Sequence, residues 1–169
     1  MTGQGMLESL IAISVITVGV LAVMAWVVSN VSASNSSALR IGAASLSWEG
    51  IEAVRELRDS AYLRGAAWDT DIAGADNTAI LVFDEAGNNF SFDFGVNALD
   101  EAGAILWRKG RLFLQSSSQP VGSVATPYRR LIRIENISAN EKKVLSEVQW
   151  IDRGKPSSII SEERLFDWR

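Results

Sequence analysis

The feature that most constrains this chain is a long apolar run near its N-terminus. Leu10–Val28 is 19 consecutive residues without a charged side chain, and no charge occurs from Ser9 to Leu39. At about 1.5 Å per residue, a helix of about 19 residues spans roughly 28 Å, which is close to the hydrocarbon thickness of a bilayer. We therefore expect a membrane helix that extends from Leu10 to Val28.

A single carboxylate, that of Glu8, stands at the head of this apolar run. An acidic side chain at the centre of a bilayer costs about 2.5–3.5 kcal/mol on insertion scales, and such a group is usually retained for a partner. One interpretation is that Glu8 only reaches the membrane surface, since it lies two residues before Leu10. Its place in the sequence supports a second interpretation.

The N-terminal residues resemble those of type IV pilins and pseudopilins. Gly3 precedes Gln4, Glu8 is the fifth residue counted from Gln4, and MLESLIAISVITVGVL is similar to the apolar segment of that family. The resemblance covers roughly residues 3–60. It implies that residues 1–3 are a leader peptide, that prepilin peptidase cleaves after Gly3, and that the new amine of Gln4 is methylated.

The same resemblance implies a role for Glu8 and a set of partners. In the family this glutamate attracts the N-terminal amine of a neighbouring subunit, so subunit pairing is the role that we favour for Glu8. The implied partners are prepilin peptidase, other pilin or pseudopilin subunits, an assembly platform protein and membrane lipid. The implied location is the cytoplasmic membrane, crossed once, with the C-terminal head outside the cytoplasm and with incorporation into a cell-surface filament.

Composition excludes several other classes of function. The chain has 169 residues, a net charge of −4, no cysteine and no histidine. Disulfide frameworks, thiolate or histidine metal sites, and catalysis by Ser-His-Asp or Cys-His are therefore ruled out. The acidic balance argues against nucleic acid as a partner, because phosphate neutralisation needs a basic face. We expect no enzyme, catalytic residue, cofactor or metal, although a surface hydrolase that uses paired carboxylates remains a formal alternative.

Residues 29–64 are expected to form the membrane-distal half of one long helix. The first part, SNVSASNSS, has weak helix propensity and is also consistent with a flexible linker. Apolar residues then recur in steps of three or four, which predicts one face packed on a sheet. The predicted stripe contains Ile41, Ala44, Trp48, Ile51, Val54, Leu57 and Ala61. Gly65 is the expected helix stop.

After Gly65 the apolar period changes from 3.6 to 2, which predicts strands. The expected segments are 79–84, 90–94, a hairpin of 105–108 and 111–115, then 128–135, 144–150 and 159–168. Short turns between consecutive strands favour antiparallel pairing. The predicted fold class is α+β: a long N-terminal helix, membrane-spanning over residues 4–28, packed on an antiparallel β-sheet head of residues 65–169.

An acidic cluster after the helix has two interpretations. Asp69, Asp71 and Asp76 are hard oxygen ligands of the kind that calcium prefers. Their spacing lacks the full calcium-loop pattern and its distal glutamate, so we favour a solvated acidic loop.

Among the 6 tryptophans, three have an expected place. Trp26 lies near the outer end of the apolar run, where an interfacial anchor is expected. Trp48 and Trp150 lie on apolar faces and are expected in the core.

These features favour a structural subunit, a minor pilin or pseudopilin of a type IV pilus or type II secretion-like filament. A cleaved secretory signal fits poorly, because its apolar region is usually about 7–15 residues long. The remaining alternative is an uncleaved signal anchor that carries an extracytoplasmic binding domain and never polymerises.

Overall fold

The computed structural model describes residues 3–72, 77–84, 87 and 89–167. Two compact units follow each other along the chain, Met1–Ala38 (unit 1) and Leu39–Arg169 (unit 2). One element, α1 (Gly3–Leu63), runs through both. Unit 1 is helical, and unit 2 contains the remainder of α1 packed on an antiparallel sheet. The predicted α+β fold class is therefore confirmed.

The serine- and asparagine-rich stretch of residues 29–37 is helical and not a linker. Neither glycine nor proline interrupts it. Serine and asparagine each cost no more than about 0.7 kcal/mol relative to alanine inside a helix. Local propensity is therefore weakened in this stretch, but not enough to end the helix.

The end of α1 is set by Gly65, as the sequence predicts. Gly65 has φ +72°, the left-handed conformation that glycine adopts at little cost. Its N–H donates to the carbonyl of Tyr62 at 3.0 Å, and the N–H of Ala66 donates to the carbonyl of Ala61 at 3.0 Å. These two hydrogen bonds together form a Schellman motif, which satisfies carbonyls that the helix end would otherwise leave without donors.

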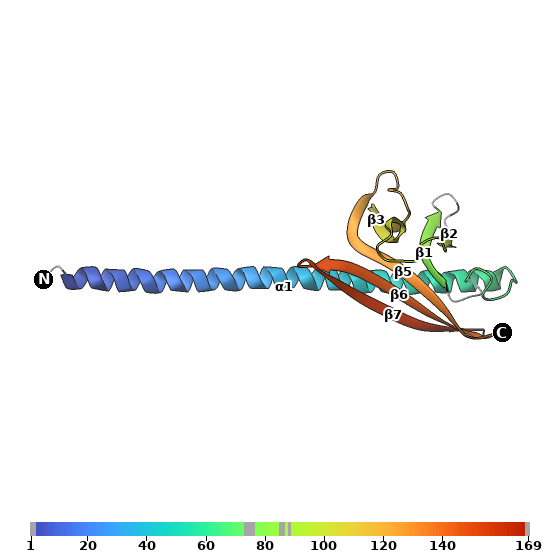
Figure 1. Ribbon diagram of the computed structural model, residues 1–169, viewed down its shortest axis with the longest axis horizontal. Helices are drawn as coiled ribbons and strands as arrows, with labels where there is room; N and C mark the ends of the chain where they lie inside the picture. Colours follow the sequence, from blue (N-terminus) through green and yellow to red (C-terminus); the bar gives the residue numbers. More distant parts are fainter. Residues whose placement is uncertain (1–2, 73–76, 85–86, 88, 168–169) are drawn as a thin grey trace. The chain divides into compact units, whose positions relative to one another are not determined.

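Seven strands form the sheet of unit 2 (Figure 1). They are β1 (Asn77–Asp84), β2 (Asn89–Asp93), β3 (Ile105–Lys109), β4 (Leu112–Gln115), β5 (Val124–Ser138), β6 (Glu141–Asp152) and β7 (Lys155–Phe166), with a short 3-10 helix, η1 (Ala102–Ala104), before β3. The order is β2-β1-β5-β3-β4, while β6 pairs with β5 and β7 pairs with β6. Every pairing is antiparallel.

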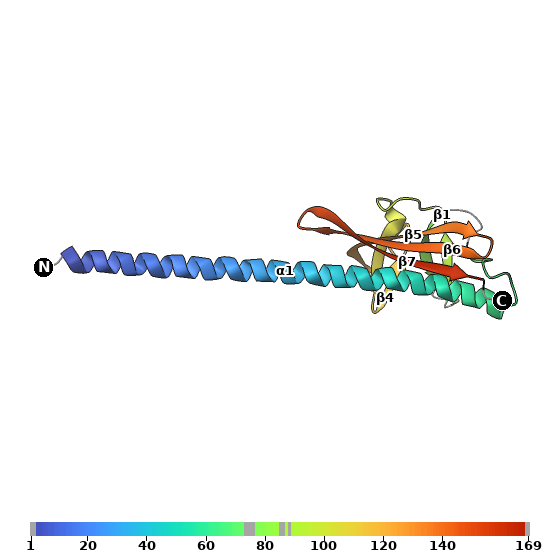
Figure 2. The ribbon, with the colours of Figure 1, turned by 90° about the horizontal axis from the view of Figure 1, so that it is seen from below.

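The long strand β5 organises this sheet. One edge of β5 pairs with β3 near Ile105 and with β1 near Ala79, and its other edge pairs with β6 along most of its length. Strands β5, β6 and β7 run beside the part of α1 that belongs to unit 2 (Figure 2). A helix on one face of an antiparallel sheet is a two-layer solution that buries the apolar side of each element.

Alternation along β5 and β6 supplies the sheet side of the core. The inward residues of β5 and β6 are buried as the period of two predicts: Arg130, Ile132, Ile134, Val144, Ser146, Val148 and Trp150. Trp150 is 5% exposed, which confirms its predicted core position. Ile51, Val54 and Leu57 of α1 pack against Ile132, Ile134 and Val144.

The predicted apolar stripe of α1 is correct from Ile51 onward and wrong before it. Ile41 is 71% exposed and Trp48 is 54% exposed, so neither side chain belongs to the core. The buried line in this part of the helix runs instead through Ala43, Leu46 and Ser47. Around the helix axis, this buried line is displaced by about one residue position from the predicted apolar stripe.

Close approach between α1 and the sheet explains this rotation. A Cβ atom added at Gly50 would overlap Oγ of Ser146, and one added at Gly42 would overlap the hydroxyl of Tyr128. Small residues therefore face the sheet where backbone and strand come nearest, and the larger Trp48 is turned outward. Hydrophobicity alone does not reveal this choice, because the buried positions are selected by size.

Two strands begin four residues before their predicted starts, and the first is β5, which begins at Val124. β7 begins at Lys155, four residues before the predicted start, and ends at Phe166. Arg153 and Gly154 both have positive φ, so a two-residue turn returns the chain immediately after β6. Residues 85, 86 and 88, between the predicted strands of residues 79–84 and 90–94, lie outside the described residues, as does Trp168 at the end of the predicted final strand.

Candidate functional site

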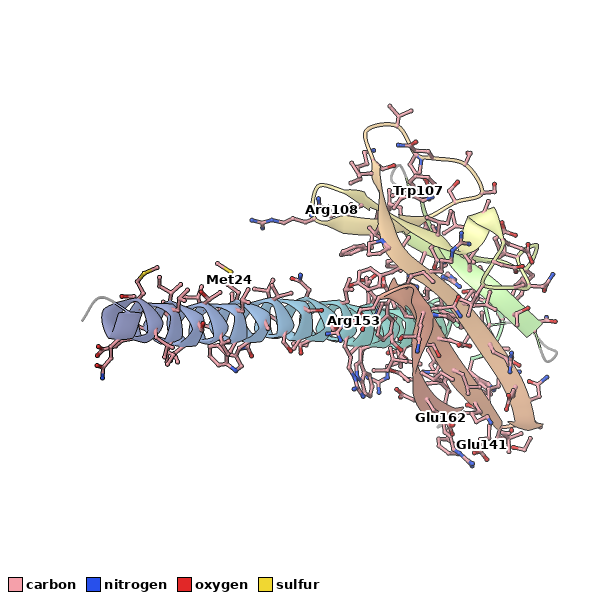
Figure 3. All side chains as sticks on the ribbon, turned by 60° about the vertical axis from the view of Figure 1, so that its left-hand side comes forward. Met24, Trp107, Arg108, Glu141, Arg153 and Glu162 are labelled. Atoms are coloured by element: carbon pink, nitrogen blue, oxygen red, sulfur yellow. The ribbon has the colours of Figure 1, made fainter. Side chains whose placement is uncertain are left out.

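Unit 1 presents an apolar surface around its whole helical circumference. From residue 4 to residue 31 every residue is exposed, including Met6, Val18 and Trp26. Figure 3 shows Met24 among the side chains that project from this part of α1. Within the described residues, α1 is the one helix long and apolar enough to cross a membrane. Apolar residues on every side indicate that this helix lies in an apolar solvent or against an apolar partner, since exposing such a surface to water is energetically unfavourable.

The hydroxyl groups inside this run are satisfied within the helix. Ser9 donates to the carbonyl of Gly5 at 2.8 Å, Ser14 to that of Leu10 at 2.7 Å, and Thr17 to that of Ile13 at 2.7 Å. Each bond reaches four residues back along the chain. A membrane supplies no water to such groups, so internal hydrogen bonds remove the cost of placing them in lipid.

The predicted processing and pairing residues lie at the start of α1. Gly3 is the first helical residue, and Gln4 and Glu8 are both exposed. Residues four apart lie on the same face of a helix, so Gln4 and Glu8 share one face. No hydrogen bond or ion pair joins the Glu8 carboxylate to any other described residue. The predicted pairing of Glu8 with a neighbouring subunit stays a prediction.

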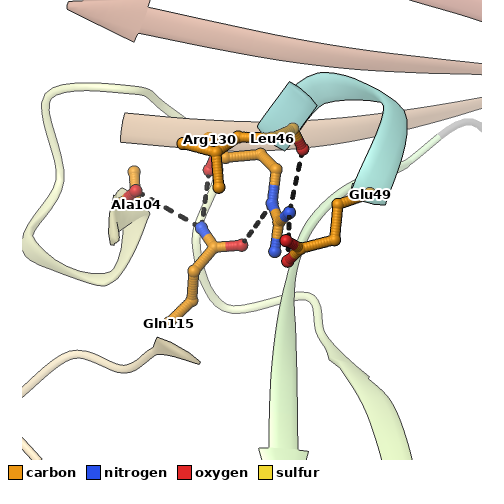
Figure 4. Close-up of polar contacts among 5 residues, drawn as sticks. All are labelled: Leu46, Glu49, Ala104, Gln115 and Arg130. Atoms are coloured by element: carbon orange, nitrogen blue, oxygen red, sulfur yellow. Dashed lines mark hydrogen bonds and ion pairs between the residues drawn. The ribbon is translucent and has the colours of Figure 1, made fainter. Parts of the chain in front are cut away.

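A buried arginine fastens α1 to the sheet in unit 2. Arg130 is 1% exposed and lies beneath the helix on β5 (Figure 4). Its Nη1 donates to the carbonyl of Leu46 at 3.0 Å and lies 3.2 Å from Oε1 of Glu49. Its Nε donates to Oε1 of Gln115 at 3.0 Å. Burial lowers the pKa of Arg130, and the nearby Glu49 carboxylate partly raises it again.

Gln115, on β4, completes this buried network. Its Nε2 donates to the carbonyl of Arg130 at 2.8 Å and to that of Ala104 at 3.3 Å. The buried guanidinium of Arg130 therefore has a carboxylate, a carbonyl and an amide oxygen as partners, as a buried charge requires. Sequence alternation placed Arg130 on the inward face of β5 but did not identify its partners. A charge at an inward position is the signal that points to such a network.

A second polar contact crosses the helix–sheet interface at Ser47. Its Oγ lies 2.7 Å from the carbonyl oxygen of Ser146 and accepts a hydrogen bond from the N–H of Ser161 at 3.1 Å. The hydroxyls of Ser47 and Ser161 are 2.8 Å apart. Farther along the helix, Arg55 forms a two-point ion pair with the carboxylate of Glu163 on β7. These contacts fix both the height and the rotation of the helix on the sheet.

The acidic cluster after α1 is engaged by basic side chains. Asp69 lies 3.2 Å from Nζ of Lys142, and Asp71 forms an ion pair with Arg64. Asp76 lies outside the described residues. Among those that are described, no group of three acidic or other metal-binding side chains could hold an ion.

An open pocket of about 590 Å³ lies between the end of α1 and β2. Its apolar side is formed by Phe90, Phe92 and Phe94. Glu56 and Asp71 are its carboxylates, and Asp71 is already paired with Arg64. The alternation of phenylalanines in β2 was predicted, but the pocket was not, because it depends on how β2 meets the helix.

Comparison with known proteins identifies no relative of this chain: no family model, no curated protein and no solved structure matches it.

Proposed function

We propose that this chain is a structural subunit, a minor pilin or pseudopilin, of a type IV pilus or a type II secretion-like filament. The observation that carries the proposal is the register of Gly3, Gln4 and Glu8 at the head of an apolar helix. A glycine, a glutamate at one fixed distance from it and an unbroken apolar run must coincide at one terminus. The resemblance of these residues to the pilin N-terminus supports the proposal, and the α+β layout is consistent with it.

The exposed surface of unit 1 supplies the physical logic of assembly. In the membrane, its apolar side chains contact lipid. In a filament, the same side chains contact helices of other subunits, so extraction need not expose about 19 apolar residues to water. An assembly platform protein moves the subunit from the first environment to the second. The sheet of unit 2 remains outside the cytoplasm and forms part of the filament surface.

Glu8 acts in this proposal as a device that sets register. Two opposite charges about 4 Å apart attract by about 4 kcal/mol at an effective dielectric near 20. Burial offsets much of that attraction, so the pair contributes more to specificity than to stability. The methylated amine of Gln4 on one subunit and the carboxylate of Glu8 on its neighbour are the two partners.

A second candidate function is a membrane-anchored domain that binds a ligand and never polymerises. The pocket beside Phe90, Phe92 and Phe94 favours this alternative, because a concave apolar surface with polar groups at its rim suits a small ligand. Under this alternative unit 1 serves as an anchor only. Neither prepilin peptidase nor other subunits would then be partners.

N-terminal processing distinguishes the two functions. The chain purified from cells with an active prepilin peptidase should begin at Gln4 and carry one added methyl group, as measured by mass spectrometry. Gly3→Ala should slow cleavage and Gly3→Leu should abolish it, because only a small residue lets the backbone approach a protease site closely. Met1 or Thr2 retained in the parent chain would reject the filament proposal and leave the anchored domain.

A further inference from the structure

Exposed positive charges gather in unit 2. Five exposed basic residues, which we call the basic collar, are Arg40, Arg108, Arg111, Arg153 and Lys155. Within the described part of the chain, no ion pair joins any of the five to a carboxylate. Seven other basic residues of unit 2 are paired: Arg55, Arg58, Arg64, Arg130, Lys142, Lys143 and Arg164. The collar therefore holds much of the positive charge that is available to a partner.

Three elements bring the collar residues to one end of unit 2. Leu39, Phe113 and Trp150 belong to one apolar cluster, so the start of this part of α1, strand β4 and the end of β6 lie together. Arg40 follows Leu39 directly. The remaining four collar residues lie on the two hairpins that β4 and β6 help to form, namely Arg108, Arg111, Arg153 and Lys155.

The two ends of the β6–β7 hairpin differ in how their basic residues are paired. Lys142, Lys143 and Arg164 at one end form ion pairs, whereas Arg153 and Lys155 at the other form none with the described residues. Asp152 pairs with Lys155 in register at one end of the hairpin, and Glu141 pairs with Phe166 at the other. Figure 3 shows Arg108 and Arg153 toward one end of unit 2, and Glu141 and Glu162 toward the other. A chain with a net charge of −4 thus presents a positive end.

Exposed apolar side chains lie among the collar residues. Leu112 follows Arg111 directly, Val124 lies opposite Arg108 in the β3–β5 register, and Ile151 lies opposite Pro156 beside the β6–β7 turn. All three apolar side chains are exposed. Basic groups interleaved with exposed apolar groups suit the interface of an anionic bilayer, where charge meets lipid phosphates and apolar side chains enter the headgroup layer.

We propose that the basic collar binds the anionic headgroups of the membrane that unit 1 crosses. This inference rests on the membrane role proposed above. Chain connectivity selects lipid as the partner, because Arg40 lies only 12 positions after Val28, the end of the apolar run. Arg40 is therefore tethered to the proposed membrane segment through the backbone of α1. A tether of this kind gives even a weak contact a high effective concentration.

Lipid binding through the collar would orient unit 2 before the subunit leaves the membrane. Contacts with headgroups hold the exposed hairpins of β3–β4 and β6–β7 against the bilayer. They are electrostatic, so they must weaken in salt: the Debye length falls from about 10 Å at 0.1 M to about 3 Å at 1 M. They also require anionic lipid.

The test uses the full chain in nanodiscs and a fluorescent label beside the collar. The chain has no cysteine, so Leu112→Cys creates a single labelling site. Ala139→Cys, in the exposed turn between β5 and β6, is the matched control far from the collar along the sheet. Quenching of each label by a nitroxide on the lipid headgroup is measured in phosphatidylcholine alone and with about 30% phosphatidylglycerol.

The proposal predicts quenching at position 112 that rises about twofold or more with phosphatidylglycerol and is lost in 1 M salt. The label at position 139 should respond to neither. Replacement of the collar charges, in R108Q/R111Q/R153Q/K155Q, should abolish the rise. The salt series on the labelled parent gives the same information without this variant.

Two negative outcomes have different meanings. A chain that enters the nanodisc, but whose label at position 112 ignores lipid charge and salt, overturns the collar proposal and leaves the membrane role intact. A chain that does not enter the nanodisc at all overturns the membrane role, and the collar proposal with it. An acidic protein partner would give the first of these results.

Discussion

The two halves of α1 use one continuous helix in two different ways. In unit 1, glycine and bulky apolar residues occur with no preferred side, and a Cβ added at Gly19 would touch nothing within 4 Å. In unit 2, residues 39–63 have one buried face, where Gly50 leaves no room for a Cβ beside Ser146. The first half of α1 has no buried face, whereas the second half has one face that fits the sheet of unit 2. The distribution of apolar and small residues around the helix therefore indicates a different environment for each half.

The polar groups of the two halves differ in the same way. In unit 1, the hydroxyls of Ser9, Ser14 and Thr17 bond to carbonyls of their own helix. In unit 2, polar groups reach across to strands, as Ser47 does with Ser146 and Ser161. Under the proposed role, in which unit 1 passes from lipid to other subunits, such hydroxyls need no new hydrogen-bond partner in either environment. A helix that must hold one position benefits from polar groups that bond to a fixed neighbour.

The largest expected effect concerns the buried arginine of unit 2. Arg130→Ala removes a charge, leaves a cavity and deprives Gln115 of its donor, so the free energy of unfolding should fall by about 4–5 kcal/mol. This loss is measured by chemical denaturation of the full chain in detergent, in which the circular dichroism signal of the β-strands is monitored. Arg108→Ala, at an exposed collar position, is the control and should change stability by less than about 0.5 kcal/mol. Equal losses for the two variants would show that Arg130 does not fasten the helix.

Two tryptophans in unit 2 provide the next comparison. Trp150→Ala should cost about 3–5 kcal/mol, because its side chain is buried beside Ala43 and Leu46. Trp48→Ala should change stability by about 0.5 kcal/mol or less, since that side chain is exposed. Thermal melting of both variants in the same detergent measures the difference. A large loss of stability for Trp48→Ala would show that Trp48 is buried and that the helix has the rotation that the sequence predicts.

Glycine to alanine changes should have opposite signs in the two halves. Gly50→Ala forces an overlap with Ser146 and should destabilise unit 2 by about 1–3 kcal/mol. Gly19→Ala should be neutral for unit 2 and should favour the helix of unit 1 by up to about 1 kcal/mol. The melting temperature of unit 2 and the amide exchange of unit 1 report the two effects. Destabilisation of unit 2 by Gly19→Ala would contradict the distinction between the halves.

The elements that the sequence predicted correctly are those with a simple period. The apolar run, the helix stop at Gly65, and the alternation of Ile132 and Ile134 with outward residues all follow from local rules. Antiparallel pairing follows from the short turns between strands. Such features depend on nearest neighbours along the chain, so one sequence suffices to find them.

The features that the sequence did not predict depend on how two elements meet. The outward position of Trp48 follows from the close contact of Gly50 with Ser146. The partners of Arg130 come from two separate elements, α1 and β4. Leu131, on the opposite face of β5 from Arg130, is buried under the segment that contains Val96 and Ala104, which no strand pattern indicates. The roles of Gly3, Gln4 and Glu8 depend on other molecules and stay predictions.

The central claim is that unit 1 exchanges lipid for other subunits, with Glu8 setting the register. Glu8→Gln and Glu8→Ala remove the charge from the apolar end, so membrane levels should remain normal or rise. In a filament core, both variants leave the amine of Gln4 without a partner, so incorporation into sheared filaments should fall sharply. The N-terminal mass must be read beside this result, since an unmethylated Gln4 can cyclise and lose its charge. Normal incorporation of Glu8→Ala, with a charged N-terminus confirmed, would contradict the claim.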